Sequence, residues 1–277
     1  MKKVSCIIVG IAMLTVGAMA ELITFTAAEG YADGNLADNA NWVMQGAQSP
    51  TNFIVNSTAG TVTMSPAGYQ KAIYQNGMAG GMSSYTVGVG FSFDRLAQSI
   101  SDTPVVMSAE LTASNNERVT VQLTRANGTS NYRLTFFSNT GGGIANVNIN
   151  WTGATANKFG FNDTTSDDSS DDLWLQMDLF RGADSDAWYV VGSISNVTTS
   201  LNIVAFTSGV FSTSAAFYDS IEYFAALNTV VDGTTSQIAN RVITSFLVEA
   251  VPEPATVGLF VVSAIGLLIS RKFRKEN

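Results

Sequence analysis

The sequence predicts an all-β protein, built as an antiparallel sandwich or barrel. No window between residues 21 and 250 keeps apolar residues at helical spacing over three turns. Segments in which apolar and polar residues alternate recur instead, at intervals of roughly ten to twenty residues. Gly, Asn, Ser and Asp, which favour turns, lie between these segments. No repeat of fixed period is visible, which disfavours a solenoid or propeller.

A hairpin is the clearest local feature. Residues 118–124 alternate between polar and apolar side chains, and residues 131–137 do the same. Between them, Asn127-Gly128 supplies the positive φ that a tight turn needs. The other segments predicted as strands are residues 53–55, 61–64, 85–93, 105–111, 144–151, 172–180, 187–193, 201–207, 220–227 and 242–248.

The N-terminus has the pattern of a secretory signal peptide. Two lysines follow Met1, residues 4–19 are almost entirely apolar, and Ala18 and Ala20 form an A-x-A cleavage site. We therefore expect residues 1–20 to be removed, with a permanent N-terminal anchor as the alternative. The chain's one cysteine, Cys6, lies too early in the apolar run to be a lipidated residue.

The composition of residues 21–250 limits the chemistry that they can perform. They contain no cysteine and no histidine, which excludes disulfides and Ser-His-Asp or Cys-His sites. With 8 Lys+Arg and 20 Asp+Glu, their net charge is 8 − 20 = −12. Such a charge argues against nucleic acid or anionic lipid headgroups as partners and favours solubility or cation binding. This length fits one large β domain as well as two small ones, but no linker divides it.

The last segment, residues 251–277, combines three features in order. Pro252, Glu253 and Pro254 form an extended motif, because two prolines disfavour helix. Residues 255–270 carry no charge and would span roughly 24 Å as a helix, slightly less than a hydrocarbon core. The basic residues that follow would stop transfer on the cytoplasmic side; they are Arg271, Lys272, Arg274 and Lys275.

This order resembles the PEP-CTERM sorting signal of Gram-negative bacteria. The resemblance implies that an exosortase recognises Pro252, Glu253 and Pro254 and removes the tail. The protein would first be held in the inner membrane and then reach the cell envelope or an exopolysaccharide matrix. A plain single-span anchor without sorting is the alternative.

A second resemblance begins near the predicted mature N-terminus. Glu29-Gly30-Tyr31-Ala32-Asp33-Gly34-Asn35-Leu36, followed by Asn41-Trp42, is similar to the opening of bacterial concanavalin-A-like (LamG-type) domains. This resemblance implies a two-sheet antiparallel jelly roll over residues 21–250. Residues 241–249 would be the closing strand, pairing near the N-terminus, and residues 172–179 and 188–191 would be long central strands.

Two acidic segments are candidate calcium sites, since carboxylate oxygens are the ligands that calcium prefers. The denser one comprises Asp163, Asp167, Asp168, Asp171 and Asp172. It lacks the EF-hand spacing, and a solvated loop is the alternative. Asp33, Asn35 and Asp38 form the weaker candidate, with ordinary turn chemistry as its alternative.

Catalytic residues are hard to find in this sequence. The E-x-D-x-x-E stretch of laminarinase-type jelly rolls is missing. In the nearest stretch, Asp219 and Glu222 would point to opposite faces of a strand. Asp178 stands among apolar neighbours, which suggests the rim of a sheet rather than a paired site. We therefore predict a non-enzymatic protein with a structural role and no resident cofactor.

The alternative function is a lectin-like carbohydrate binder, calcium-dependent if the acidic loop binds the ion. Aromatic rings stack on sugars, but a two-layer core needs large side chains as well. The candidate aromatic residues are Trp42, Tyr69, Tyr74, Trp151, Trp174, Trp188, Tyr189 and Tyr218.

Overall fold

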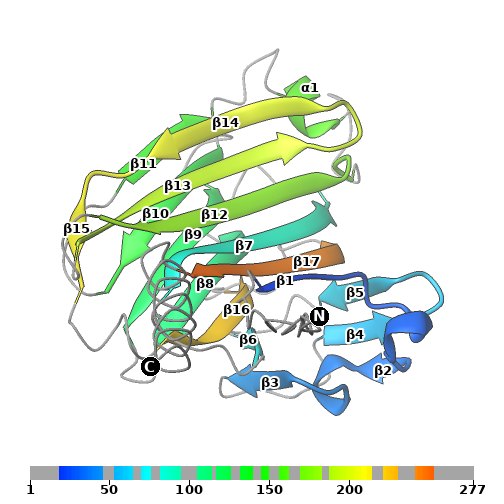
Figure 1. Cartoon of the computed structure of the whole chain (residues 1–277). Coiled ribbons are helices and arrows are strands. Elements are labelled where there is room, and N and C mark those ends of the chain that lie inside the picture. The colour runs from blue at the N-terminus through cyan, green and yellow to red at the C-terminus, as the bar shows by residue number, and fades with distance from the viewer. Residues whose placement is uncertain are drawn as a thin grey trace, which may run out of the picture.

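The structure is a computed structural model of the chain. It describes residues 19–45, 53–64, 70–75, 82–94, 105–113, 117–125, 132–139, 145–149, 156–161, 169–182, 187–213, 221–229 and 241–252. Within these ranges the protein consists of two stacked antiparallel sheets, which confirms the predicted all-β sandwich (Figure 1).

The larger sheet has ten strands. Eight of them follow the order β14-β13-β12-β7-β17-β5-β4-β2, while β1 also pairs with β17 and β15 with β13. Their bounds are β1 Met19–Ile23, β2 Gly34–Asn35, β4 Phe53–Asn56, β5 Thr61–Met64, β7 Met82–Phe93, β12 Leu173–Arg181, β13 Ala187–Asn196, β14 Leu201–Thr207, β15 Phe211–Ser212 and β17 Arg241–Pro252.

The smaller sheet has seven strands in the order β11-β10-β9-β8-β16-β6-β3. Their bounds are β3 Trp42–Gln45, β6 Gln70–Tyr74, β8 Val105–Ala113, β9 Arg118–Arg125, β10 Tyr132–Ser138, β11 Ala145–Ile149 and β16 Ile221–Thr229. Three short helices complete the described residues: the 3-10 helices η1 Ala27–Glu29 and η2 Leu36–Asp38, and helix α1 Ala156–Phe159.

The core lies between the sheets because alternate residues of each strand point inward. In β12, for example, Leu173, Leu175, Met177 and Leu179 are fully buried. Trp42, Tyr74 and Phe246 form an aromatic cluster with ring centroids 5.1–5.9 Å apart.

One buried cation also joins the two sheets. Arg241, on β17, is 1% exposed and donates hydrogen bonds from Nη1 to the carbonyl oxygens of Val105 and Val106, both at 3.2 Å.

Several sequence predictions are confirmed. The predicted hairpin is β9–β10, an antiparallel pair with Phe136 opposite Val121. The predicted closing strand is β17, which pairs with β1 near the N-terminus. β12 and β13 lie side by side within the larger sheet.

Two strands extend past the predicted bounds of residues 21–250. β1 begins at Met19, two residues before the predicted mature N-terminus, and β17 continues to Pro252, past the predicted boundary at Ala250. Among the described residues, no helix has the length and apolar character needed to cross a membrane. The predicted cleavage residue Ala18, Glu253, Pro254 and the basic tip lie outside the described residues.

Candidate functional site

A row of polar and aromatic side chains lies on the outer face of the ten-stranded sheet. Because side chains alternate along β12, Trp174, Gln176, Asp178 and Phe180 all point away from the core and are half-buried. We call the first three, together with Thr86 of the neighbouring strand β7, the Trp174 row.

Hydrogen bonds connect the members of the Trp174 row. The indole Nε1 of Trp174 donates to Oε1 of Gln176 at 2.9 Å. Gln176 Nε2 donates to both carboxylate oxygens of Asp178, each at 2.9 Å, and Thr86 Oγ1 donates to Oδ1 of Asp178 at 2.7 Å. Each side chain therefore has its orientation fixed by a partner in the row.

The indole of Trp174 lies directly over a glycine. A Cβ atom at Gly88 would be only 2.2 Å from Cζ2 of Trp174 and 2.9 Å from Cε2. Only glycine at position 88 therefore leaves room for the ring at this place on β7. Trp174 is half-buried, so part of its side chain reaches solvent.

A stacked aromatic pair continues the same face. Phe180 lies opposite Tyr189 of β13, and their ring centroids are 5.1 Å apart with an interplanar angle of 21°. From Trp174 to Phe180 the strand advances about 20 Å. The face thus carries an indole at one end, polar groups in the middle and two rings at the other end.

The seven-stranded sheet presents a different polar group on its own outer face. Lys71 of β6 and Glu110 of β8 form an ion pair across β16, and they are only 3% and 1% exposed. Thr112 Oγ1 donates to Oε1 of Glu110 at 2.8 Å, and Thr120 Oγ1 donates to Oε2 at 3.1 Å. A charge pair so deeply buried and so fully bonded fits a structural role.

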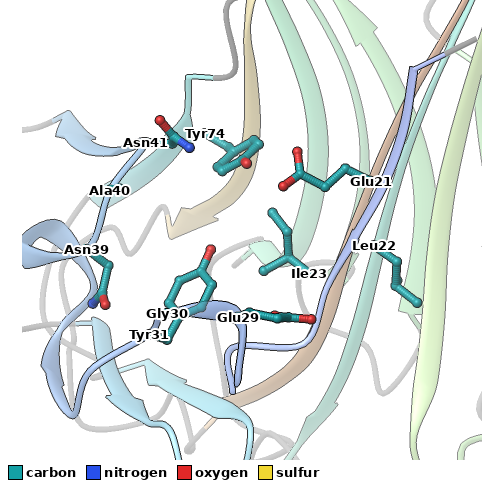
Figure 2. A pocket seen from close by; sticks show the side chains of 10 residues that line it. All are labelled: Glu21, Leu22, Ile23, Glu29, Gly30, Tyr31, Asn39, Ala40, Asn41 and Tyr74. Carbon is teal, nitrogen blue, oxygen red and sulfur yellow. The ribbon is translucent and has the colours of Figure 1, made fainter. Parts of the chain in front are cut away.

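A small cavity lies beside β1 at the edge of the sandwich (Figure 2). It encloses about 180 Å³, and Glu21, Glu29, Tyr31 and Tyr74 are among the residues that line it. Burial raises the pKa of the Tyr31 phenol, and the charges of Glu29 and Glu21 raise it further. Burial, followed by a hydrogen bond to Glu21, also raises the pKa of Tyr74. Both phenols therefore stay protonated at neutral pH.

The opening motif explains this cavity structurally. Trp42 Nε1 donates to the phenol oxygen of Tyr31 at 2.9 Å. Glu29 accepts hydrogen bonds from the backbone N and from Oγ1 of Thr24, at 2.8 and 2.7 Å. These contacts fasten the opening segment to the sandwich, so we assign the cavity to the fold and not to a ligand.

The weaker calcium candidate is occupied by turn contacts. Asp33 Oδ1 accepts hydrogen bonds from the backbone N and Oγ of Ser57, at 2.7 and 2.8 Å, which lowers the pKa of the carboxyl. Asn35 Nδ2 donates to Oδ2 of Asp38 at 3.1 Å. This geometry is the ordinary turn chemistry considered as the alternative.

The denser acidic segment is described only at one end. Asp163, Asp167 and Asp168 lie outside the described residues. Asp171 Oδ2 accepts a hydrogen bond from Asn196 Nδ2 at 2.7 Å, and the backbone N of Asp172 donates to Thr198 Oγ1 at 3.3 Å. Over the part of the chain that the structure describes, no group of three or more acidic side chains is placed to hold a metal ion.

The aromatic candidates divide into two groups. Trp42, Tyr74 and Trp188 are core residues, whereas Trp174 and Tyr189 are half-buried on the outer face. Tyr69, Trp151 and Tyr218 lie outside the described residues.

Asp178 is not at the rim of a sheet as predicted but in the middle of the outer face, because β7 and β13 flank β12 there. The sequence analysis did not identify Gln176, Thr86 or Gly88 as part of a site. Because side chains alternate along a strand, Gln176 could have been placed on the same face as Trp174 and Asp178.

Comparison with known proteins identifies the fold. No family model and no curated protein matches the chain. Among solved structures, it is similar to an endo-1,3-beta-glucanase from Streptomyces sioyaensis, with 12% identity, a TM-score of 0.53, and coverage of 86% of this chain and 98% of that one. It is also similar to the winged bean acidic lectin complexed with methyl-alpha-D-galactose, with 8% identity, a TM-score of 0.51, and coverage of 85% and 100%. The fold is therefore the concanavalin-A-like jelly roll, as the opening motif predicted.

These comparisons correct the prediction that the chain is not an enzyme. The fold is also that of an endo-1,3-beta-glucanase. Sequence reasoning had equated missing histidine and a missing E-x-D-x-x-E stretch with a non-enzymatic sandwich. That step was wrong, because this fold supports both binding and catalysis.

Proposed function

We propose that this protein is an exported carbohydrate-binding jelly roll whose Trp174 row holds a polysaccharide chain. The observation that carries the proposal is the half-buried indole of Trp174, which packs against Gly88 and donates its Nε1 hydrogen bond to Gln176. An aromatic ring held in one orientation offers an apolar surface to the C–H groups of a sugar. The lectin and glucanase folds to which the chain is similar agree with this class of ligand.

The polar members of the row complement the ring. Asp178 accepts three hydrogen bonds within the protein, and a carboxylate offers about four lone-pair sites, so it can accept one more from a sugar hydroxyl. The Phe180–Tyr189 pair extends the apolar surface along β12. This length favours an extended chain of several sugars over a single monosaccharide.

A glycan array with the full chain in detergent tests the proposal, with 1,3-β-glucan, galactosides and alginate among the probes. Trp174→Ala should weaken binding by about tenfold or more, because a buried aromatic anchor contributes at least 1–2 kcal/mol. Trp174→Phe is the matched control, since it keeps an aromatic face and should retain most of the affinity. Undiminished binding by Trp174→Ala would refute the site.

After incubation with the protein, the same glycans are assayed for new reducing ends and unsaturated products. These products would show cleavage, whereas binding without them would show a binding module.

We further infer that the chain is carried to the inner membrane and sorted through its C-terminus. The support is the order of Pro252-Glu253-Pro254, the uncharged run 255–270 and the basic tip. In this proposal an exosortase acts at the motif and releases the domain to the envelope or a polysaccharide matrix. Changing Pro252 and Pro254 to Ala should leave export intact and keep the protein in the membrane fraction. Equal release of both forms would leave only a plain anchor.

A further inference from the structure

Both ends of the described chain lie at the same end of the ten-stranded sheet. Met19, the first residue of β1, pairs with Ala250, and Pro252, the last residue of β17, pairs with Met82. At this end β12 finishes at Arg181 and β13 begins at Ala187. We call this the proximal end, and Figure 1 shows it where β7 begins and β15 lies. The two apolar segments of the sequence therefore attach on neighbouring strands.

The proximal end carries side chains suited to a lipid headgroup layer. Val210, just before β15, is 72% exposed. The stacked Phe180–Tyr189 pair, which is also the near end of the proposed polysaccharide site, lies here. Tyrosine is enriched where a membrane meets water.

The opposite end of the same sheet, which we call the distal end, lies where β12 begins and β13 ends. Asp94 ends the segment of β7 there, and Asp171 and Asp172 precede β12. Val197, in the turn between β13 and β14, is 55% exposed and also lies at this end.

Chain length places the proximal end close to the lipid. The uncharged run begins at Ala255, only three residues after Pro252. Three residues span at most about 10 Å even when fully extended. The headgroup layer on one side of a bilayer is itself about 5–8 Å thick. A strand ending at Pro252 therefore cannot stand clear of a membrane that holds residues 255–270.

We propose that the proximal end of the ten-stranded sheet lies against a phospholipid surface, with the distal end pointing away from it. This inference rests on the proposed insertion of the C-terminal segment. The Trp174 row runs along β12 between the two ends, so its Trp174 end points away from the membrane. A polysaccharide in the surroundings then meets the indole first.

Two matched single-cysteine variants test this orientation in the full chain. Val210→Cys and Val197→Cys are both exposed valines, about 30 Å apart along the sheet. Cys6→Ala in each makes the new thiol unique. Each variant is labelled with an environment-sensitive fluorophore and reconstituted in phosphatidylethanolamine/phosphatidylglycerol liposomes that contain spin-labelled headgroups. The label at 210 should be quenched at least twofold more than the label at 197.

A flotation assay on the same liposomes separates the two levels of the argument. If the protein floats and both labels are quenched equally, or the label at 197 more strongly, the orientation is wrong while anchoring stands. If the protein does not float, the proposed membrane anchoring is wrong, and the orientation that rests on it is wrong as well. Preferential quenching at 210 in floating protein supports both.

Discussion

The outer faces of the two sheets carry the same kinds of polar group in opposite surroundings. On the seven-stranded sheet, Glu110 is 1% exposed and is held by Lys71, Thr112 and Thr120. On the ten-stranded sheet, Asp178 is half-buried and is held by Gln176 and Thr86. Both carboxylates project from a strand away from the core.

This difference in burial separates a structural role from a binding role. A carboxylate removed from water must be paired, and its pairing stabilises one arrangement of the strands. A half-buried carboxylate in an oriented row keeps its access to solvent and so to a ligand. Side-chain alternation places polar residues on the outer face of both sheets. Their exposure to solvent then separates the residues that stabilise the fold from those that can bind a ligand.

The largest effect is expected from Lys71→Met. This change leaves Glu110 buried without its cation, which should lower the free energy of unfolding by about 3–5 kcal/mol. Urea unfolding of wild type and variant measures the difference. The double variant Lys71→Met with Glu110→Leu should recover most of the loss, because no unpaired charge remains. A double variant less stable than the single one would contradict the structural interpretation of the pair.

Gly88→Ala should have the next largest effect. Its Cβ would lie 2.2 Å from Trp174, so the indole must leave its place. We expect a stability loss of about 1–3 kcal/mol from overpacking and a loss of glycan binding similar to that of Trp174→Ala. Gly209→Ala is the matched control, since a Cβ there meets no atom within 4 Å. Intact glycan binding by Gly88→Ala would argue against the Trp174 row as the site.

The strands of this fold were predictable where the period-two pattern is long. The predicted residues 61–64 and 201–207 coincide with β5 and β14 because both are bounded by clear turn residues. β6 was missed, since Lys71 and Gln70 look like solvent-exposed turn residues until Glu110 is seen to pair with Lys71. Such a pairing joins residues 39 positions apart, which no local pattern reveals.

The candidate site was predictable only in part. Trp174 and Asp178 were both singled out, but as unrelated residues. The hydrogen bond from Thr86 to Asp178 joins positions 92 residues apart, and it depends on the register between β7 and β12. The role of Gly88 likewise depends on that register. The resemblance of the opening motif supplied the jelly roll; the contacts across strands supplied the site.

Asp178→Asn tests the half-buried carboxylate of the ten-stranded sheet against the buried Glu110. The amide keeps the shape of the side chain, but it cannot accept from both Gln176 and Thr86 in the same way. We expect a stability loss of about 0.5–1.5 kcal/mol, smaller than that of Lys71→Met, together with several-fold weaker glycan binding. Thermal unfolding and the glycan array measure the two effects. If Asp178→Asn weakens glycan binding while Thr86→Val leaves it unchanged, the carboxylate of Asp178 contacts the sugar directly.

Asp33→Asn extends the series to a carboxylate at the surface and should have the smallest effect. Hydrogen bonds from Oγ and the backbone N of Ser57 lower the pKa of Asp33 below its ordinary value. Because the folded pKa is the lower one, the carboxylate stabilises the protein above the ordinary pKa of about 3.9, and this contribution is lost as pH falls through the folded value. The melting temperature of Asp33→Asn should therefore lie slightly below that of wild type at pH 7 and converge with it near pH 2. A difference that persists unchanged at pH 2 would mean that the charge of Asp33 is not what the turn depends on.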